Sequence, residues 1–170
     1  MSNSVRTELF EVGPGSRPYL IAEIGLNHNG DLDLAKRMVD AAKAAGASSA
    51  KFQLFSSEFF IHPGASLGDG GPGSLAGFFK QFELKADEWV KLAEHTRAQG
   101  LDFACSVFDA PSVELYATLR PAYVKIASCD VNNFLLLNMI RPLGLPVFLS
   151  TGTADEHEVE TAVRHLSGLP

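Results

Sequence analysis

Apolar and polar residues follow one another along the chain in a repeating order of short apolar runs and amphipathic segments. Residues 19–24 form an apolar run that leads into a polar, glycine-containing turn. Residues 32–45 then show helical spacing, with Leu34, Met38 and either Ala41 or Ala42 on one face. Asp31 stands before this segment and Gly46 after it. A strand, a turn and a capped helix are the first half of a βαβ unit.

The same order recurs four more times. Strands are predicted at residues 50–55, 101–107, 122–127 and 146–149, and helices at 87–99, 111–119, 132–141 and 155–166. From the third strand the repeat is only 21 to 24 residues, and no Gly-x-Gly-x-x-Gly follows a strand. Both features favour an α/β fold of the (β/α) TIM-barrel type over a doubly wound sheet. Because a full barrel takes about 250 residues, we expect an incomplete one, with about five βα units of eight.

The predicted organisation is one domain with a lead-in. Residues 1–18 contain several glycines and prolines and are interpreted as an N-terminal lead-in, with a short strand near residues 9–12. Residues 19–170 form the partial TIM-barrel domain. Within it, residues 56–85 are predicted to be a long loop, because glycine and proline are concentrated there and the strand-helix order resumes afterwards. Such a loop is either functional, for example a lid, or a disordered insertion.

Charge and composition exclude several classes of function. The net charge of -6 argues against a nucleic-acid partner. No apolar run reaches the about 18 residues of a membrane span, and the first ten residues lack the apolar segment of a signal peptide. Two cysteines, Cys105 and Cys129, do not make a disulfide framework. We therefore expect a cytoplasmic protein with reduced thiols.

Polar side chains collect where the predicted strands end. They are Glu23, Lys51, Gln53, Ser106, Asp109, Lys125, Ser128, Asp130, Ser150 and Thr151. In a βα barrel these ends meet at one face, the face that carries active sites. Two lysines and several hydroxyls predict a site for an anion, most simply phosphate or carboxylate. Glu23 and Asp130 would then transfer protons or hold a polar substrate.

Structural explanations stand beside these functional ones. The two lysines either snorkel toward solvent or pair with Glu23 and Asp130 as buried ion pairs. A strand-end serine is also a common helix cap, and His28 in its turn is interpreted as a local hydrogen-bonding residue. His157 and His165 lie eight residues apart, unlike a helical metal pair. No residue of this chain is therefore predicted to bind a metal.

Four segments together resemble a known family. They are Ile-Ala-Glu-Ile-Gly-Leu-Asn-His-Asn-Gly at residues 21–30, Lys-Phe-Gln at 51–53, Lys-Ile-Ala-Ser at 125–128 and Leu-Ser-Thr-Gly at 149–152. In order and spacing they resemble the signatures of the N-acetylneuraminate (sialic acid) synthase family, which includes legionaminate, pseudaminate and spore-coat polysaccharide synthases. The resemblance covers residues 16–168.

The resemblance implies a TIM-barrel transferase that condenses phosphoenolpyruvate with an open-chain 2-acetamido sugar such as N-acetylmannosamine and releases phosphate. It implies Glu23 and Lys125 as catalytic residues. Implied contacts to phosphoenolpyruvate are Lys51, Ser106, Lys125, Ser128 and Ser150. Gln53 and Asp130 would line the same mouth. A divalent metal, Mn or Mg, is expected to activate the sugar aldehyde.

The resemblance also implies that the metal ligands, further phosphoenolpyruvate contacts and a C-terminal domain lie beyond Pro170. Three positions depart from the family pattern. Val107 follows Ser106 where the family has proline, Cys129 stands where glycine is usual, and Thr153 replaces a common methionine. These departures bear on substrate specificity and activity rather than on the fold.

Two other functions remain open from the sequence. One is a non-catalytic remnant that binds a phosphorylated ligand. The other is a Schiff-base aldolase with Lys125 as the nucleophile. A five-stranded sheet also leaves open edges. We expect a homodimer formed through those edges, or dependence on a further segment; a solitary flattened α/β sheet is the alternative.

Overall fold

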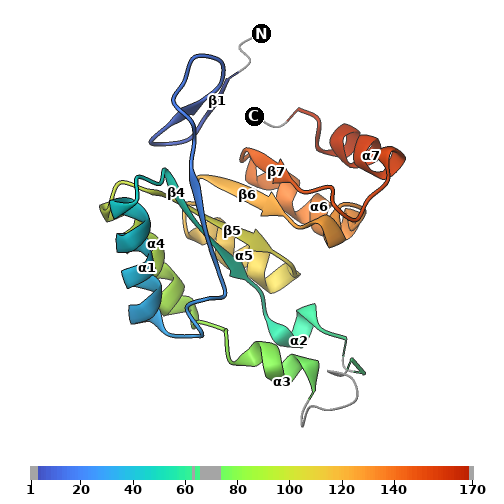
Figure 1. Cartoon of the computed structure of the whole chain (residues 1–170). Helices are drawn as coiled ribbons and strands as arrows, with labels where there is room; N and C mark the ends of the chain where they lie inside the picture. Colours follow the sequence, from blue (N-terminus) through green and yellow to red (C-terminus); the bar gives the residue numbers. More distant parts are fainter. Residues whose placement is uncertain (1–3, 63, 66–73, 169–170) are drawn as a thin grey trace.

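A five-stranded parallel sheet is the centre of the computed structural model, which describes residues 4–62, 64–65 and 74–168 (Figure 1). Its strands are β3 (Ile21–Gly25), β4 (Ser49–Leu54), β5 (Asp102–Val107), β6 (Tyr123–Ile126) and β7 (Val147–Leu149). Their spatial order is β3-β4-β5-β6-β7, so every strand pairs with its neighbour in sequence. The predicted α/β order is confirmed. Closure of this sheet as part of a barrel stays a prediction.

Helices follow the strands at the expected places. They are α1 (Leu32–Ala44), α4 (Ala86–Ala98), α5 (Ala110–Thr118), α6 (Phe134–Ile140) and α7 (Glu156–Leu166), with the 3₁₀ turns η1 (Ser128–Asp130) and η2 (Arg141–Leu143). The Asp31 carboxylate accepts a hydrogen bond from Leu34 N and caps α1. Asp155 caps α7 in the same way. Short polar side chains before these two helices thus start them where the sequence indicates.

The core lies between the helices and one face of the sheet. Phe52 and Phe103 on that face pack against Trp89 of α4, with ring centroids 6.1 Å and 6.4 Å from the tryptophan. On α1 the buried residues are Ala35, Val39 and Ala42, whereas Leu34 and Met38 are half-buried. Of the predicted inner residues, Ala42 is thus buried, whereas Leu34 and Met38 lie at the edge of the buried face. Its small side chains suit a close approach of the helix backbone to the sheet.

The prediction of a long loop over residues 56–85 is wrong where the structure describes it. This segment contains two short helices, α2 (Ser57–Phe60) and α3 (Leu75–Lys80). Aromatic contacts stabilise both, because Phe60 and Phe79 pack against Phe55. The many glycines and prolines of the segment indicated a loop, although its phenylalanines pack together and stabilise helices. Residue 63 and residues 66–73 lie outside the described part. The two interpretations of the segment, a lid or an insertion, therefore stay predictions.

The lead-in forms a small hairpin rather than a single strand. Strand β1 (Val5–Arg6) pairs antiparallel with β2 (Glu11–Val12), and the second strand falls where one was predicted. The boundary at residue 18 stays a prediction. Tyr19 follows the hairpin, and its hydroxyl donates to Asp102 Oδ2 at 2.6 Å, which joins this segment to the start of β5. None of the described helices is long and apolar enough to cross a membrane.

Candidate active site

The two faces of the sheet differ sharply in chemistry. Phe52 on β4 is fully buried in the apolar core. The flanking residues Lys51 and Gln53 lie on the opposite face, because successive strand residues alternate. In the sheet register Gln53 is beside Ser106, and Ser106 is beside Lys125. The strands therefore carry an amide, a hydroxyl and an ammonium group side by side on one polar face.

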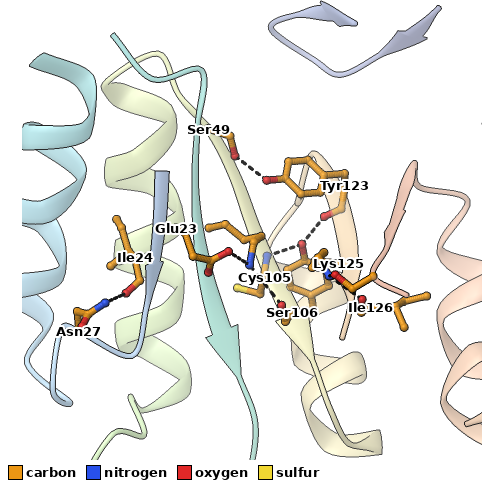
Figure 2. A network of polar contacts seen from close by, with 12 residues as sticks. Glu23, Ile24, Asn27, Ser49, Cys105, Ser106, Tyr123, Lys125 and Ile126 are labelled. Carbon is orange, nitrogen blue, oxygen red and sulfur yellow. Dashed lines mark hydrogen bonds and ion pairs between the residues drawn. The ribbon is translucent and has the colours of Figure 1, made fainter. Parts of the chain in front are cut away.

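Lys51 lies on this polar face between Glu23 and Ser106, two residues that Figure 2 labels. Its Nζ is 2.5 Å from Glu23 Oε2 and donates to Ser106 Oγ at 3.4 Å. Lys51 is almost wholly buried, whereas the Glu23 side chain is 57% exposed. The ion pair that the sequence left open is therefore present, with its carboxylate at the solvent side. An anion that displaces Glu23 from Lys51 would meet a buried cation.

Lys125 provides a second cation on the same face. Its Nζ donates to Ile126 O at 2.8 Å and to Ser150 Oγ, so β6 and the end of β7 both hold the ammonium group. Burial, and then the like charge of Lys51, lower the pKa of Lys125. Two lysines on the same face of the sheet are suited to binding a multiply charged anion.

Gln53 and Glu23 approach each other beside Gly25. A Cβ atom on Gly25 would lie 3.6 Å from Gln53 Nε2 and 3.8 Å from Glu23 Oε1. Gly25 has a φ of +59°, and the pairing of β3 with β4 shifts register between Glu23 and Gly25. This left-handed bulge favours glycine. It brings the carboxylate and the amide to the same side of the site.

Ser128 and Asp130 lie on the turn η1. Thr153 Oγ1 donates to Ser128 O at 2.7 Å, and a Cβ atom on Gly152 would lie 4.0 Å from Ser128 Oγ. Thr153, which differs from the family pattern, thus connects the turn after β7 to the turn after β6 through a hydrogen bond. Asp130 instead accepts from Asn133 Nδ2 at 3.0 Å and from the Cys129 thiol at 3.5 Å. In the described residues no ion pair joins Asp130 to Lys125.

A buried hydrogen-bond network that the sequence did not indicate lies next to the polar face, toward the amino-terminal ends of the strands. Ser49 Oγ and the Tyr123 hydroxyl are 3.0 Å apart (Figure 2). The Tyr116 hydroxyl donates to Tyr123 O and accepts from Cys105 N at 2.8 Å. Tyr123 precedes Lys125 by two residues and shares its face, a signal that alternation alone could have provided. The network joins β4, β5 and β6 beneath the two lysines.

His28 has a structural role. It is fully buried, and its Nδ1 accepts from Gly30 N at 3.2 Å, as expected of a local hydrogen-bonding residue. Its ring lies 6.2 Å from Phe52 and 6.3 Å from Trp89. Burial lowers the pKa of His28 and therefore favours the neutral imidazole. The position of these distant aromatic rings could not be read from the turn itself.

Metal ligands are a separate question. Across residues 4–62, 64–65 and 74–168, no three His, Cys, Asp or Glu side chains come together as a metal site. Cys105 is buried and Cys129 is exposed, and burial raises the pKa of both thiols. The described residues therefore do not fit the divalent metal that the family resemblance implies.

The structure defines an α/β protein with a five-stranded parallel sheet, one face of which carries Lys51, Ser106 and Lys125. The chain belongs to the NeuB family, which matches residues 38–169.

Curated relatives agree with this assignment. The N,N'-diacetyllegionaminic acid synthase of Legionella pneumophila is 33% identical over 151 residues, which are 85% of this chain and 42% of the relative. The N-acetylneuraminate-9-phosphate synthase of Drosophila melanogaster is 35% identical over 151 residues, covering 86% of this chain and 41% of the relative. The chain thus spans about two fifths of the length of these relatives.

Solved structures show the same fold. The sialic acid synthetase of Leptospira borgpetersenii, crystallised with citrate, superposes with a TM-score of 0.84 at 35% identity. That match covers 98% of this chain and 55% of the other. A truncated 3-deoxy-D-arabino-heptulosonate 7-phosphate synthase from Thermotoga maritima has a TM-score of 0.66 at 13% identity and supports the fold alone.

Proposed function

We propose that this chain forms the phosphoenolpyruvate-binding part of a nonulosonic acid synthase. In this reaction carbon 3 of phosphoenolpyruvate attacks the aldehyde of an open-chain 2-acetamido sugar. Water adds at carbon 2, and phosphate leaves by cleavage of its C–O bond. One observation carries the proposal: Lys51 and Lys125, each beside a serine hydroxyl, lie on one face of a sheet in a member of this family.

Each residue of the polar face has a role in the proposal. Lys51 and Lys125 neutralise the phosphate and carboxylate of phosphoenolpyruvate. The hydroxyls that complete the anion contacts belong to Ser106, Ser128 and Ser150. Glu23 is released from Lys51 when the anion binds, and its exposed carboxylate then exchanges a proton at the sugar aldehyde. Gln53 beside it, and Asp130 on η1, hold sugar hydroxyls.

The divalent metal of the family, Mn or Mg, would polarise the aldehyde oxygen when bound. No step above is assigned to it, since the described residues provide no ligand set. The second substrate is an acylamino sugar. Its identity is left open by the relatives, because one is named for a 9-phosphorylated product and another for a diacetylated one at almost the same identity.

Calorimetry of phosphoenolpyruvate binding tests the proposal. We expect binding to the unmodified chain, independent of added Mn, and a loss of about tenfold or more in Lys125→Ala because a charged contact disappears. Lys91→Ala is the matched control, since Lys91 is an exposed lysine of α4 paired with Asp87. Binding that survives in Lys125→Ala, or that never appears, contradicts the proposal.

A Schiff-base aldolase is the second candidate. The lowered pKa of Lys125, caused by burial and then by Lys51, favours a neutral amine that can attack a carbonyl. Borohydride treatment in the presence of pyruvate would then leave a stable adduct on Lys125. Mass spectrometry that finds no adduct on this residue eliminates the aldolase and leaves the first proposal standing.

A further inference from the structure

Four phenylalanine rings form a cluster that the proposed chemistry does not use. We call it the aromatic wall: Phe55, Phe60, Phe79 and Phe108. The Phe60 ring lies 5.4 Å from Phe55, 5.5 Å from Phe79 and 4.9 Å from Phe108. Phe55 is buried, whereas the other three rings are half-buried. The wall therefore keeps part of its aromatic surface open to solvent.

The wall continues the polar face of the sheet toward its carboxyl end. Phe55 follows Gln53 by two residues, and Phe108 follows Ser106 by two. Both phenylalanines are the first residues after their strands, β4 and β5, so they lie at the carboxyl end of the sheet just beyond Gln53 and Ser106. In Figure 1 the helices α2 and α3, which provide Phe60 and Phe79, lie beyond the tip of the β4 arrow. A substrate that extends from Gln53 past the end of β4 would therefore approach this wall.

The charges near the wall do not favour a second anion. Glu83 Oε1 accepts from Ser57 N at 2.6 Å, and Asp109 Oδ2 accepts from Ser56 N at 2.7 Å. Lys80 is the nearby lysine of α3, and its Nζ is already 3.2 Å from Glu83 Oε2. Among the described residues around the wall, carboxylates thus balance or outnumber the cations. A phosphate placed here would lose its hydration without gaining a free cation.

We propose that the aromatic wall binds the far end of the acylamino sugar and selects an uncharged, apolar end over a phosphorylated one. This inference rests on the proposed function and specifies its second substrate. Aromatic rings bind the C–H groups of a deoxy carbon by apolar contact, and they exclude a dianion that brings tightly held water. The polar face would bind the aldehyde end of the sugar, and the aromatic wall would contact its carbon 6.

Two sugars that differ only at carbon 6 test the proposal. They are 2-acetamido-2,6-dideoxymannose and N-acetylmannosamine 6-phosphate, each titrated by calorimetry into the chain saturated with phosphoenolpyruvate. We expect the 6-deoxy sugar to bind about tenfold or more tightly than the 6-phosphate. In Phe60→Ala this preference should fall to within about threefold, because the central ring of the wall is gone.

A matched control lies one residue away. Phe59 of the same helix α2 is 63% exposed, so Phe59→Ala should keep the full preference. Phe60→Lys should gain binding of the 6-phosphate, which a mere loss of folding would not produce.

The outcomes separate this inference from the proposed function. Three outcomes overturn the inference about the aromatic wall alone. They are equal affinity for the two sugars, an equal loss of preference in Phe59→Ala, and the absence of sugar binding while phosphoenolpyruvate still binds. Absence of phosphoenolpyruvate binding overturns the proposed function and this inference with it.

Discussion

At the residue scale, Lys51 and Lys125 show how a parallel sheet concentrates like charges. Each ammonium group has one hydroxyl partner, and only Lys51 has a carboxylate, among the described contacts. The two positive charges have only one carboxylate between them, and a bound dianion would balance them. Alternation along β4 correctly put Lys51 and Gln53 on one face. The level of Lys125 beside Ser106 depends on the hydrogen-bond register between strands, which alternation within one strand does not determine.

Asp102 gives a residue-scale prediction about pH. It is only 2% exposed, and burial raises the pKa of its carboxyl above the ordinary value of 3.8, although the Tyr19 hydroxyl acts in the opposite direction. The folded state therefore prefers the protonated form. Its contribution to stability is fully present below about pH 4 and is lost as pH rises through the raised folded pKa.

The Asp102→Asn variant should remove this dependence, because asparagine stays neutral and still accepts from Tyr19. We expect the melting temperature of the variant, relative to the unmodified chain, to be higher at pH 7 than at pH 4. Thermal unfolding at both values measures it. Glu94→Gln, at an exposed position of α4, is the control and should show no such change. A difference that stays constant with pH contradicts the argument.

At the element scale, caps and stops were the most predictable features. Asp31 and Asp155 cap their helices, and Gly46, just after the end of α1, has a φ of +84° that suits glycine. The short helices α2 and α3 were missed because tertiary aromatic contacts, not local propensity, stabilise them. The bulge at Gly25 was also invisible, since it is a property of the pairing between β3 and β4.

Asp109 supplies an element-scale prediction about stability. Its Oδ1 accepts from Ser112 N at 2.9 Å to cap α5, and its Oδ2 accepts from Ser56 N. One buried carboxylate therefore holds two turns. We expect Asp109→Ala to lower the free energy of unfolding by about 2–3 kcal/mol. The exposed cap Asp155 serves one helix only, so Asp155→Ala should cost about 1 kcal/mol. Urea denaturation compares the two, and equal losses would refute the double role.

At the whole-molecule scale, the βα order, its short repeat and the parallel sheet were all predictable from the sequence. These features follow from the alternation of apolar runs with amphipathic segments, which is a local signal. The arrangement of the sheet edges is not local. In the described part, β3 and β7 are the outer strands, and each pairs with one neighbour only. Phe148 on β7 is 36% exposed.

These edges lead to a prediction about assembly. We expect the chain to form a homodimer, because an unpaired strand edge is a template for pairing with another chain. Light scattering coupled to size-exclusion chromatography should give twice the mass of the 18.3 kDa chain, with dissociation on dilution. A stable, monodisperse monomer at all concentrations would contradict this prediction and favour the solitary sheet.

The neighbour-by-neighbour strand order has a consequence for how the protein is made. Each new strand joins the edge that the preceding strand has just formed, and the longest connection, residues 55–101 between β4 and β5, costs the most entropy to close. No strand has to wait for a distant partner. During synthesis from the amino terminus, each strand can therefore pair with the existing sheet soon after it leaves the ribosome.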